Sequence, residues 1–178
     1  RARGCDLFVF ADRKVGMHII ADWPSNALKV MTSLPLPADE WSHVAATYDG
    51  SGKAAGVSFY VNGEKQNVEI ESDKLSGSTA NDQPFRVGGR SADSPLTSSV
   101  KDVILVQHGV GPQEARALFQ SSLRQVLGNL QLSTLAEATQ KQLDKLLLAV
   151  ANDPLAIEQR DTRQSLEATQ EERTKYEA

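Results

Sequence analysis

The stretch "WSHVAATYDGSGKAAGVSFYVNGEKQ", residues 41–66, decides the fold of this 178-residue chain. Within it Val57, Phe59 and Val61 fall on every second position, which is the period of a strand with one buried face. The Asn-Gly pair at 62–63 favours a two-residue turn, because both central residues of that turn need a positive φ. The sequence "SFYVNGEKQNVEI", residues 58–70, therefore predicts a β-hairpin in which the run at 66–71 is the returning strand.

Strand-like runs of the same kind fill most of the chain before Pro112. They are residues 5–11, 14–21, 27–32, 42–48, 56–61, 66–71, 85–89 and 99–107. Segments rich in Gly, Pro, Asn and Asp separate these runs, and no helical pattern lies between them. This arrangement predicts a mainly β protein with an antiparallel sandwich or barrel over residues 1–111.

The pattern becomes helical at Pro112, where proline occupies the first position of a predicted helix. Ala115, Leu118 and Phe119 form one apolar stripe, and Gly128 is a typical end signal. The sequence therefore predicts a helix over 112–128 that packs on the sandwich.

Two further helix starts follow. Thr134 with Glu137 forms a capping box, and Asp153-Pro154 places an acidic N-cap before a proline. We therefore expect a helical hairpin or extension over 133–178, which completes a β-sandwich with a C-terminal α-helical extension.

Charge and composition exclude several classes of partner. The chain has 19 Lys and Arg against 23 Asp and Glu, a net charge of −4, without a basic run, which argues against nucleic acid as a partner. The longest apolar run, residues 146–151, is far shorter than the ~20 residues of a membrane-spanning helix. The single cysteine, Cys5, excludes an internal disulfide. The chain opens "RARGCDLFVF" without a Met or a signal pattern, so we expect a piece of a larger protein.

Several motifs together resemble one family. They are "W-x-H-V-A-x-T-Y-D-G" at 41–50, "F-Y-V-N-G" at 59–63, "F-R-V-G-G-R" at 85–90 and "V-K-D-V-I-L-V" at 100–106. The chain resembles the laminin-G-like branch of the concanavalin A-like lectin/glucanase fold on these motifs. The resemblance implies an antiparallel jelly-roll β-sandwich. Because this family has one or two strands before the equivalent of the first run here, it also implies an exposed or borrowed sheet edge.

A narrower resemblance concerns residues 18–30 and 48–66, which look like the lectin-like insert of large planctomycete proteins that also carry a cytochrome-c-like haem domain. It implies that the chain belongs to a larger, extracytoplasmic, multidomain protein. Two functions follow as alternatives. The first is a non-catalytic binding module with carbohydrate as its ligand. The second is a structural domain that docks against the haem or catalytic domain of its parent and binds no free ligand.

The loop "ADWPSN", residues 21–26, holds the main candidate for ligand binding. Trp23 precedes a proline, which favours an extended conformation, and Asp22 and Asn26 place short polar groups beside it. An aromatic ring flanked by such groups suits a glycan, whose apolar face stacks while its hydroxyls form hydrogen bonds. The alternative is that Trp23 folds back as a lid over the sandwich.

Three further residues complete the candidate ligand-binding set. His18 shares a strand face with Ile20 and is either a ligand contact or a half-buried structural histidine. Arg86 and Arg90 alternate on one predicted strand, so they would line the concave sheet or pair with acidic residues at the surface.

Metal binding depends on one loop. Asp49 in "TYDGSGK" would ligate calcium together with loop carbonyls, or it would form a turn before Gly50. We expect Trp41 to lie in the core with its N–H satisfied. His43 is expected to hydrogen-bond a neighbouring strand rather than a metal.

Catalysis is not expected of this segment. Glucanases with this fold are expected to carry two carboxylates on one strand in an E-x-D-x-x-E run. The nearest residues here, Glu69, Glu71 and Asp73 in "VEIESD", lack that order. The sequence also lacks a G-x-S-x-G motif, a P-loop and a dinucleotide fingerprint.

Overall fold

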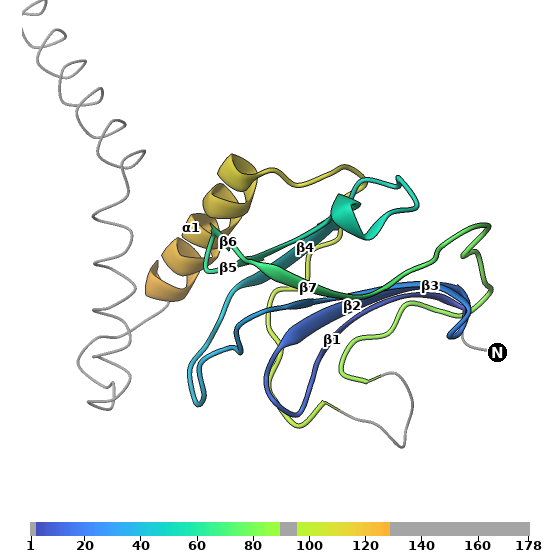
Figure 1. The fold of residues 1–178 in the computed structure, drawn as a ribbon. Helices are drawn as coiled ribbons and strands as arrows, with labels where there is room; N and C mark the ends of the chain where they lie inside the picture. The colour runs from blue at the N-terminus through green and yellow to red at the C-terminus, as the bar shows by residue number, and fades with distance from the viewer. Residues whose placement is uncertain (1–2, 90–95, 129–178) are drawn as a thin grey trace, which may run out of the picture. The chain divides into compact units, whose positions relative to one another are not determined.

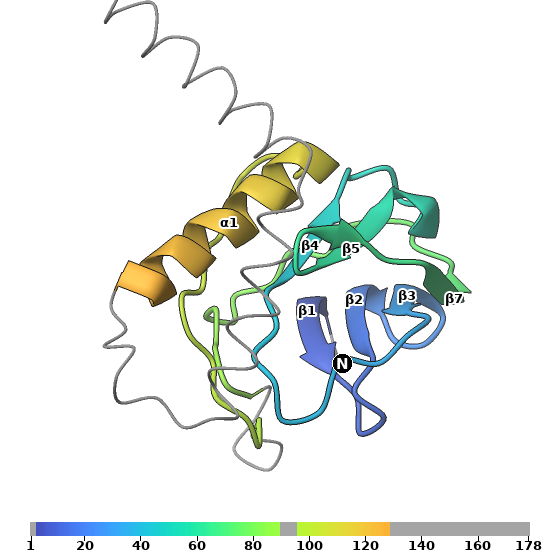
Figure 2. The ribbon, with the colours of Figure 1, turned by 90° about the vertical axis from the view of Figure 1, so that its left-hand side faces the viewer.

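The computed structural model describes residues 3–89 and 96–128, and these residues form two antiparallel sheets that face each other as layers (Figures 1 and 2). Sheet A has the spatial order β1-β2-β3-β7, and its strands are Gly4–Val9, Val15–Asp22, Asn26–Thr32 and Val68–Asp73. Sheet B has the order β4-β5-β6, and its strands are Val44–Tyr48, Val57–Val61 and Glu64–Lys65. The predicted mainly β, antiparallel fold class is confirmed.

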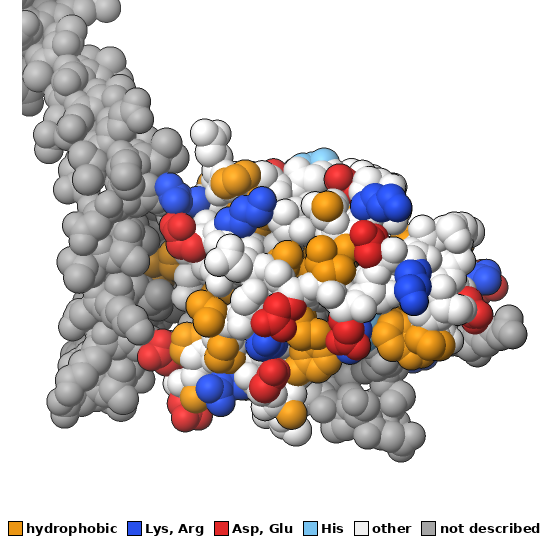
Figure 3. Space-filling view, in the orientation of Figure 1, with side chains coloured by type: hydrophobic (Ala, Val, Ile, Leu, Met, Phe, Trp, Pro, Cys, Tyr) orange, Lys and Arg blue, Asp and Glu red, His pale blue; other side chains and the backbone are white. Residues whose placement is uncertain are grey.

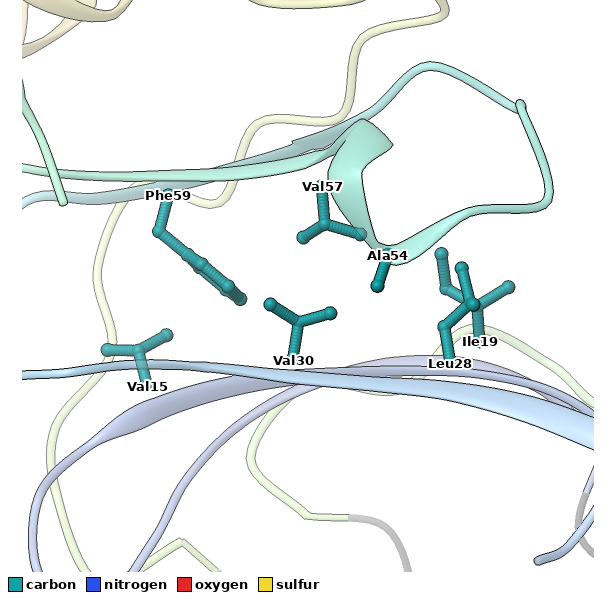
Figure 4. Packing of buried hydrophobic residues seen from close by; sticks show 7 residues of the cluster. All are labelled: Val15, Ile19, Leu28, Val30, Ala54, Val57 and Phe59. Atoms are coloured by element: carbon teal, nitrogen blue, oxygen red, sulfur yellow. The ribbon is translucent and has the colours of Figure 1, made fainter. Parts of the chain in front are cut away.

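The core lies between the two sheets. Figure 4 shows side chains of sheet A pointing toward side chains of β5 and of the short 3-10 helix Ala54–Gly56. The cluster consists of Val15, Ile19, Leu28, Val30, Ala54, Val57 and Phe59. Phe59 is fully buried, as its place in the alternating pattern predicts. Full burial of one such side chain contributes about 1.5–3 kcal/mol.

The turn at Asn62-Gly63 is confirmed, but its returning strand is shorter than predicted. Asn62 and Gly63 have φ values of 51° and 80°, and the turn pairs Val61 with Glu64. The chain then leaves sheet B, and the run predicted at 66–71 forms β7, which pairs with β3 of sheet A. The prediction that this run is the second arm of the hairpin is therefore wrong. The returning arm is β6.

Helix α1, Pro112–Gly128, occupies the residues at which the sequence predicts a helix. Its Ala115 is fully buried against Tyr60 and Val110, and Leu118 packs on the same cluster. Because Tyr60 alternates with the core residue Phe59, this contact covers the outer face of sheet B, as Figure 2 shows for α1 beside β4 and β5. The extension predicted over 133–178 lies outside the described residues.

Two predicted strands are absent. Residues 85–88 and 99–107 form no strand, and only an isolated bridge occurs, at Gly89. All of the residues 85–88 and 99–107 are exposed, and the exposed fraction of Leu105 is 71%. A strand needs a partner edge and a surface to cover, so an apolar run without both does not form one. Correspondingly, Leu7 on the core-side face of β1 stays exposed.

Trp41 does not lie in the core as predicted. It is 58% exposed and precedes β4, which begins only at Val44. The strand pattern therefore does not extend back to Trp41, and alternation places no constraint on its side chain. The predicted hydrogen bond from the His43 ring to a neighbouring strand is not found, since the ring Nδ1 has no hydrogen-bond partner among the described residues. The backbone N–H and C=O of His43 both pair with Asn62 in the turn after β5. Its ring packs against Phe119 with the ring centroids 5.9 Å apart.

Candidate functional site

Four side chains form a row across sheet A, one from each strand. They are Asp6, His18, Lys29 and Glu71, which we call the charged row. The register pairs Asp6 with His18 and His18 with Lys29. Since their strand neighbours Ile19 and Leu28 point into the core, His18 and Lys29 point to the outer face of the sheet.

The charged row is held by a hydrogen bond between His18 and Asp6 at one end and by an ion pair between Lys29 and Glu71 at the other. His18 Nδ1 lies 3.0 Å from Asp6 Oδ1, and Lys29 Nζ lies 2.6 Å from Glu71 Oε2. A cross-strand pair of opposite charge such as Lys29–Glu71 stabilises neighbouring strands by roughly 0.2–1 kcal/mol. The row therefore fixes the positions of its members across the whole width of sheet A.

Aromatic rings lie on the charged row. Phe8 stacks on the His18 ring with centroids 4.4 Å apart and an interplanar angle of 14°. Trp23 meets the same ring edge-on at 5.1 Å, and Phe10 meets Phe8 edge-on at 4.5 Å. We call Phe8, Phe10, His18 and Trp23 the aromatic cluster. Lys29 Nζ lies 5.2 Å from the Phe10 centroid and 6.0 Å from that of Trp23, a cation–π arrangement.

Gly16 makes room for two of these rings. A Cβ at this position would lie 2.8 Å from both Phe8 and Phe10. Any other residue at position 16 would therefore displace the rings that pack over β2.

Trp23 is the exposed member of the aromatic cluster, with 42% of its surface accessible. The Trp23-Pro24 peptide bond is cis. Beside the indole, Ser25 Oγ donates a hydrogen bond to Asp22 Oδ2 at 3.3 Å. The indole thus stands at the surface beside His18, with polar side chains next to it. Of the two alternatives for Trp23, the geometry favours the displayed ring over a lid across the core.

The remaining candidates have other surroundings. Asn26 bonds Ser76 in the segment after β7, with its Oδ1 accepting the Ser76 N–H at 2.6 Å, so it joins two loops. Arg86 lies in the exposed segment that forms no strand, so the argument from alternation does not apply to it. Arg90 lies outside the described residues. The structure therefore brings His18 and Trp23 together, with Asp22 adjacent.

Asp49 has the geometry of a turn residue. Its Oδ1 accepts the N–H of Ser51 at 2.9 Å, and bonds from the Ser51 side chain and backbone lower the pKa of the Asp49 carboxyl. The space beside Gly56 is filled by the same carboxylate. Across residues 3–89 and 96–128, no group of three His, Cys, Asp or Glu side chains is placed to hold a metal ion.

Two carboxylates of β7 face outward beside the aromatic cluster, and each is paired with a lysine. Glu69 lies 2.9 Å from Lys14 Nζ, and Glu71 is the end of the charged row. A retaining glycosidase instead needs two carboxyl groups facing each other across the scissile bond, roughly 5–5.5 Å apart. Glu69 and Glu71 stabilise the outer face of sheet A through their lysines.

Sequence reasoning missed five members of this site: Asp6, Phe8, Phe10, Lys29 and Glu71. Two signals were available. Lys29 interrupts the apolar run of its strand, and Gly16 is a strand glycine, which often marks a close approach by another group. Neither signal identifies the neighbour across the sheet, because that depends on the register.

A family model described as the concanavalin A-like lectin/glucanases superfamily matches residues 5–115. The chain belongs to this superfamily. The match begins within β1 and spans β2 to β7 and the first turn of α1, so the resemblance seen in the sequence motifs is confirmed. The charged row and the aromatic cluster both lie inside the matched region of this concanavalin A-like domain.

Comparison with solved structures finds an S-layer domain-containing protein, residues 221–444, from Clostridium thermocellum. The two chains share 16% identity with a TM-score of 0.37, and the match covers 66% of this chain and 64% of the other. No curated protein matches the concanavalin A-like domain in sequence. Its described part has no helix with the length and apolar character needed to cross a membrane.

Proposed function

We propose that this concanavalin A-like domain is a non-catalytic binding module for carbohydrate, with the aromatic cluster and the charged row as its binding surface. The observation that carries the proposal is the exposed indole of Trp23, held edge-on to His18 on the outer face of sheet A. A displayed aromatic ring stacks on the apolar face of a sugar. Asp22, Ser25 and Asp6 supply oxygen atoms for its hydroxyls.

The rigidity of this surface supports the proposal. His18 is buried between Phe8 and Trp23, and its pairing with Asp6 orients the ring. A ligand that stacks on Trp23 therefore orders few further side chains, and ordering costs roughly 0.5–1.5 kcal/mol for each flexible side chain. We further propose that the domain acts outside the cytoplasm as one part of a larger protein, where a lectin-like module meets its glycans.

The test is a glycan array probed with this chain, in calcium and in chelator, followed by calorimetry on the best ligand. Trp23→Ala is expected to weaken binding at least tenfold. Trp41→Ala is the matched control, because Trp41 is even more exposed but precedes β4 in the other sheet. Binding is expected to persist in chelator, since Asp49 is engaged in its turn. A blank array, or equal losses in both variants, would contradict the proposal.

A docking role is the second candidate, and one observation favours it. Val103, Ile104 and Leu105 are large, consecutive and exposed apolar residues, and such patches mark interaction surfaces. In this case the domain packs against another part of its parent protein. Docking would be favoured over carbohydrate binding by two results together. The glycan array would show no binding, and the chain would bind an apolar dye less strongly after Ile104→Ser and Leu105→Ser.

A further inference from the structure

We infer that the carbohydrate surface proposed above selects neutral saccharides over anionic ones, and that Glu69 and Glu71 set this selectivity. The inference rests on the proposed function, because it concerns the ligand class of the same surface. It follows from how the charges around Trp23 are paired and from which member of each pair faces solvent.

Lys29 is a cation close to the indole of Trp23, but it is already neutralised. Its Nζ lies 2.6 Å from Glu71 Oε2 and 5.2 Å from the Phe10 ring centroid. An ammonium held by a carboxylate and an aromatic ring has little capacity left for an acidic ligand. Lys14, on the same face, is paired in the same way, with both carboxylate oxygens of Glu69 at 2.9 Å.

The acid is the outer member of each pair. The side chain of Lys29 is 14% exposed and that of Glu71 is 52% exposed. The side chain of Lys14 is 20% exposed and that of its partner Glu69 is 51% exposed. The pair at the other end of the charged row has the same order, with His18 at 10% and Asp6 at 27%. At both lysine pairs, a ligand on the outer face of sheet A therefore meets the carboxylate before it meets the cation.

On the face drawn in Figure 3, no broad basic patch offsets this polarity. Figure 3 shows basic and acidic side chains interspersed over the face drawn, without a broad patch of one sign. The whole chain carries a net charge of −4. Because like charges brought together at an interface lower affinity, uronate or sulfate groups are disfavoured, whereas neutral hydroxyls donate hydrogen bonds to the same carboxylates.

The test measures binding of the whole chain to soluble neutral polysaccharides (laminarin, mannan and xyloglucan) and to polygalacturonate, by calorimetry at low and high NaCl. The key variant is Glu69→Gln with Glu71→Gln, which keeps side-chain size while exposing two unpaired lysines. Glu64→Gln is the control, because it removes a negative charge and an ion pair, that of Glu64 with Arg116, on β6 of the other sheet.

The wild type is expected to bind at least one neutral polysaccharide at least tenfold more tightly than polygalacturonate. The double variant is expected to bind polygalacturonate at least tenfold more tightly than the wild type does, while its affinity for the neutral ligand does not increase. Glu64→Gln is expected to change neither. Added NaCl should strengthen residual wild-type binding to polygalacturonate, and this measurement needs no variant.

Tighter wild-type binding to polygalacturonate than to the neutral ligands would overturn the inference while leaving the carbohydrate function in place. The same holds if the double variant and Glu64→Gln behave alike, or if NaCl weakens wild-type binding to polygalacturonate. Absence of binding to every polysaccharide would overturn the carbohydrate function itself, and the inference with it.

Discussion

His43 and Asn62 hold each other through two reciprocal hydrogen bonds. The His43 N–H donates to Asn62 Oδ1 at 2.9 Å, and the Asn62 N–H donates to the His43 carbonyl at 2.8 Å. These bonds tie the chain before β4 to the turn after β5. They explain why the turn residue is an asparagine, since its side chain bonds the neighbouring backbone while its own φ is positive.

We predict that Asn62→Ala lowers the free energy of unfolding by about 2–3 kcal/mol, because it removes a hydrogen bond and places a Cβ-bearing residue without a local bond at positive φ. Asn62→Gly removes the same bond but tolerates the φ, so its loss is expected to be about 1 kcal/mol. Urea denaturation of both variants checks this. Equal losses would show that backbone strain at this turn is unimportant.

Gly63 and Gly50 form a matched pair for the packing of α1. Both have φ near +80°, but a Cβ at Gly63 would lie 3.1 Å from Arg116 Cα, whereas nothing lies within 4 Å of a Cβ at Gly50. We predict that Gly50→Ala costs about 1–2 kcal/mol from φ alone. Gly63→Ala should cost more, because α1 must also shift. Thermal unfolding of the two variants measures the difference, and similar melting temperatures would contradict the close contact.

Phe59 and Phe85 allow the same substitution at a buried and an exposed site. Phe59→Ala is expected to lower the free energy of unfolding by about 3–5 kcal/mol, because it leaves a cavity between the sheets. Phe85→Ala, at a side chain that is 66% exposed, should stay within about 0.5 kcal/mol of the wild type. Denaturant unfolding monitored by circular dichroism measures both. A large loss at Phe85 would show that residues 85–88 pack in a way this fold does not contain.

Stability is expected to fall in mild acid because of His43. Burial lowers the pKa of His43 below its ordinary value, so the unfolded chain takes up the proton more readily than the folded one. The free energy of unfolding therefore has its full value above a pH of about 6.5 and decreases as the pH falls below that value. The His43→Gln variant should lose this dependence. Unfolding free energies of both proteins between pH 5 and 8 check the prediction, and parallel curves would refute it.

The local parts of the fold follow from the sequence. Phe59 is buried and Asn62-Gly63 turns the chain because period and turn chemistry act within a few residues. The strand predictions fail where a distant partner decides the outcome. Residues 99–107 have a strand pattern but pair with no strand within residues 3–89 and 96–128, and β7 pairs with β3 rather than with β5. Pairing of this kind is a long-range property that a single segment does not contain.

In the candidate site, too, the sequence indicates local features but not contacts between distant residues. Trp23 is recognisable in the sequence from its loop, and His18 from its place on a strand, but their contact depends on how the β2–β3 connection folds over β2. Lys29 and Glu71 are neighbours only through the β3–β7 register, which contains a shift between Lys29 and Val30. Sequence reasoning therefore found the displayed aromatic residue and missed the charges around it.

The pairing of β3 with β7 also has a consequence for the order of assembly. The whole of sheet B lies between Thr32 and Val68 in the sequence, so closing this loop costs more entropy than forming the β4–β5 hairpin within it. We expect β7, an edge strand, to join last and its amide hydrogens to exchange with solvent before those of β2. Glu71 then reaches Lys29 only when the last strand is in place, so the surface around Trp23 acquires its final charge pattern at the end of folding.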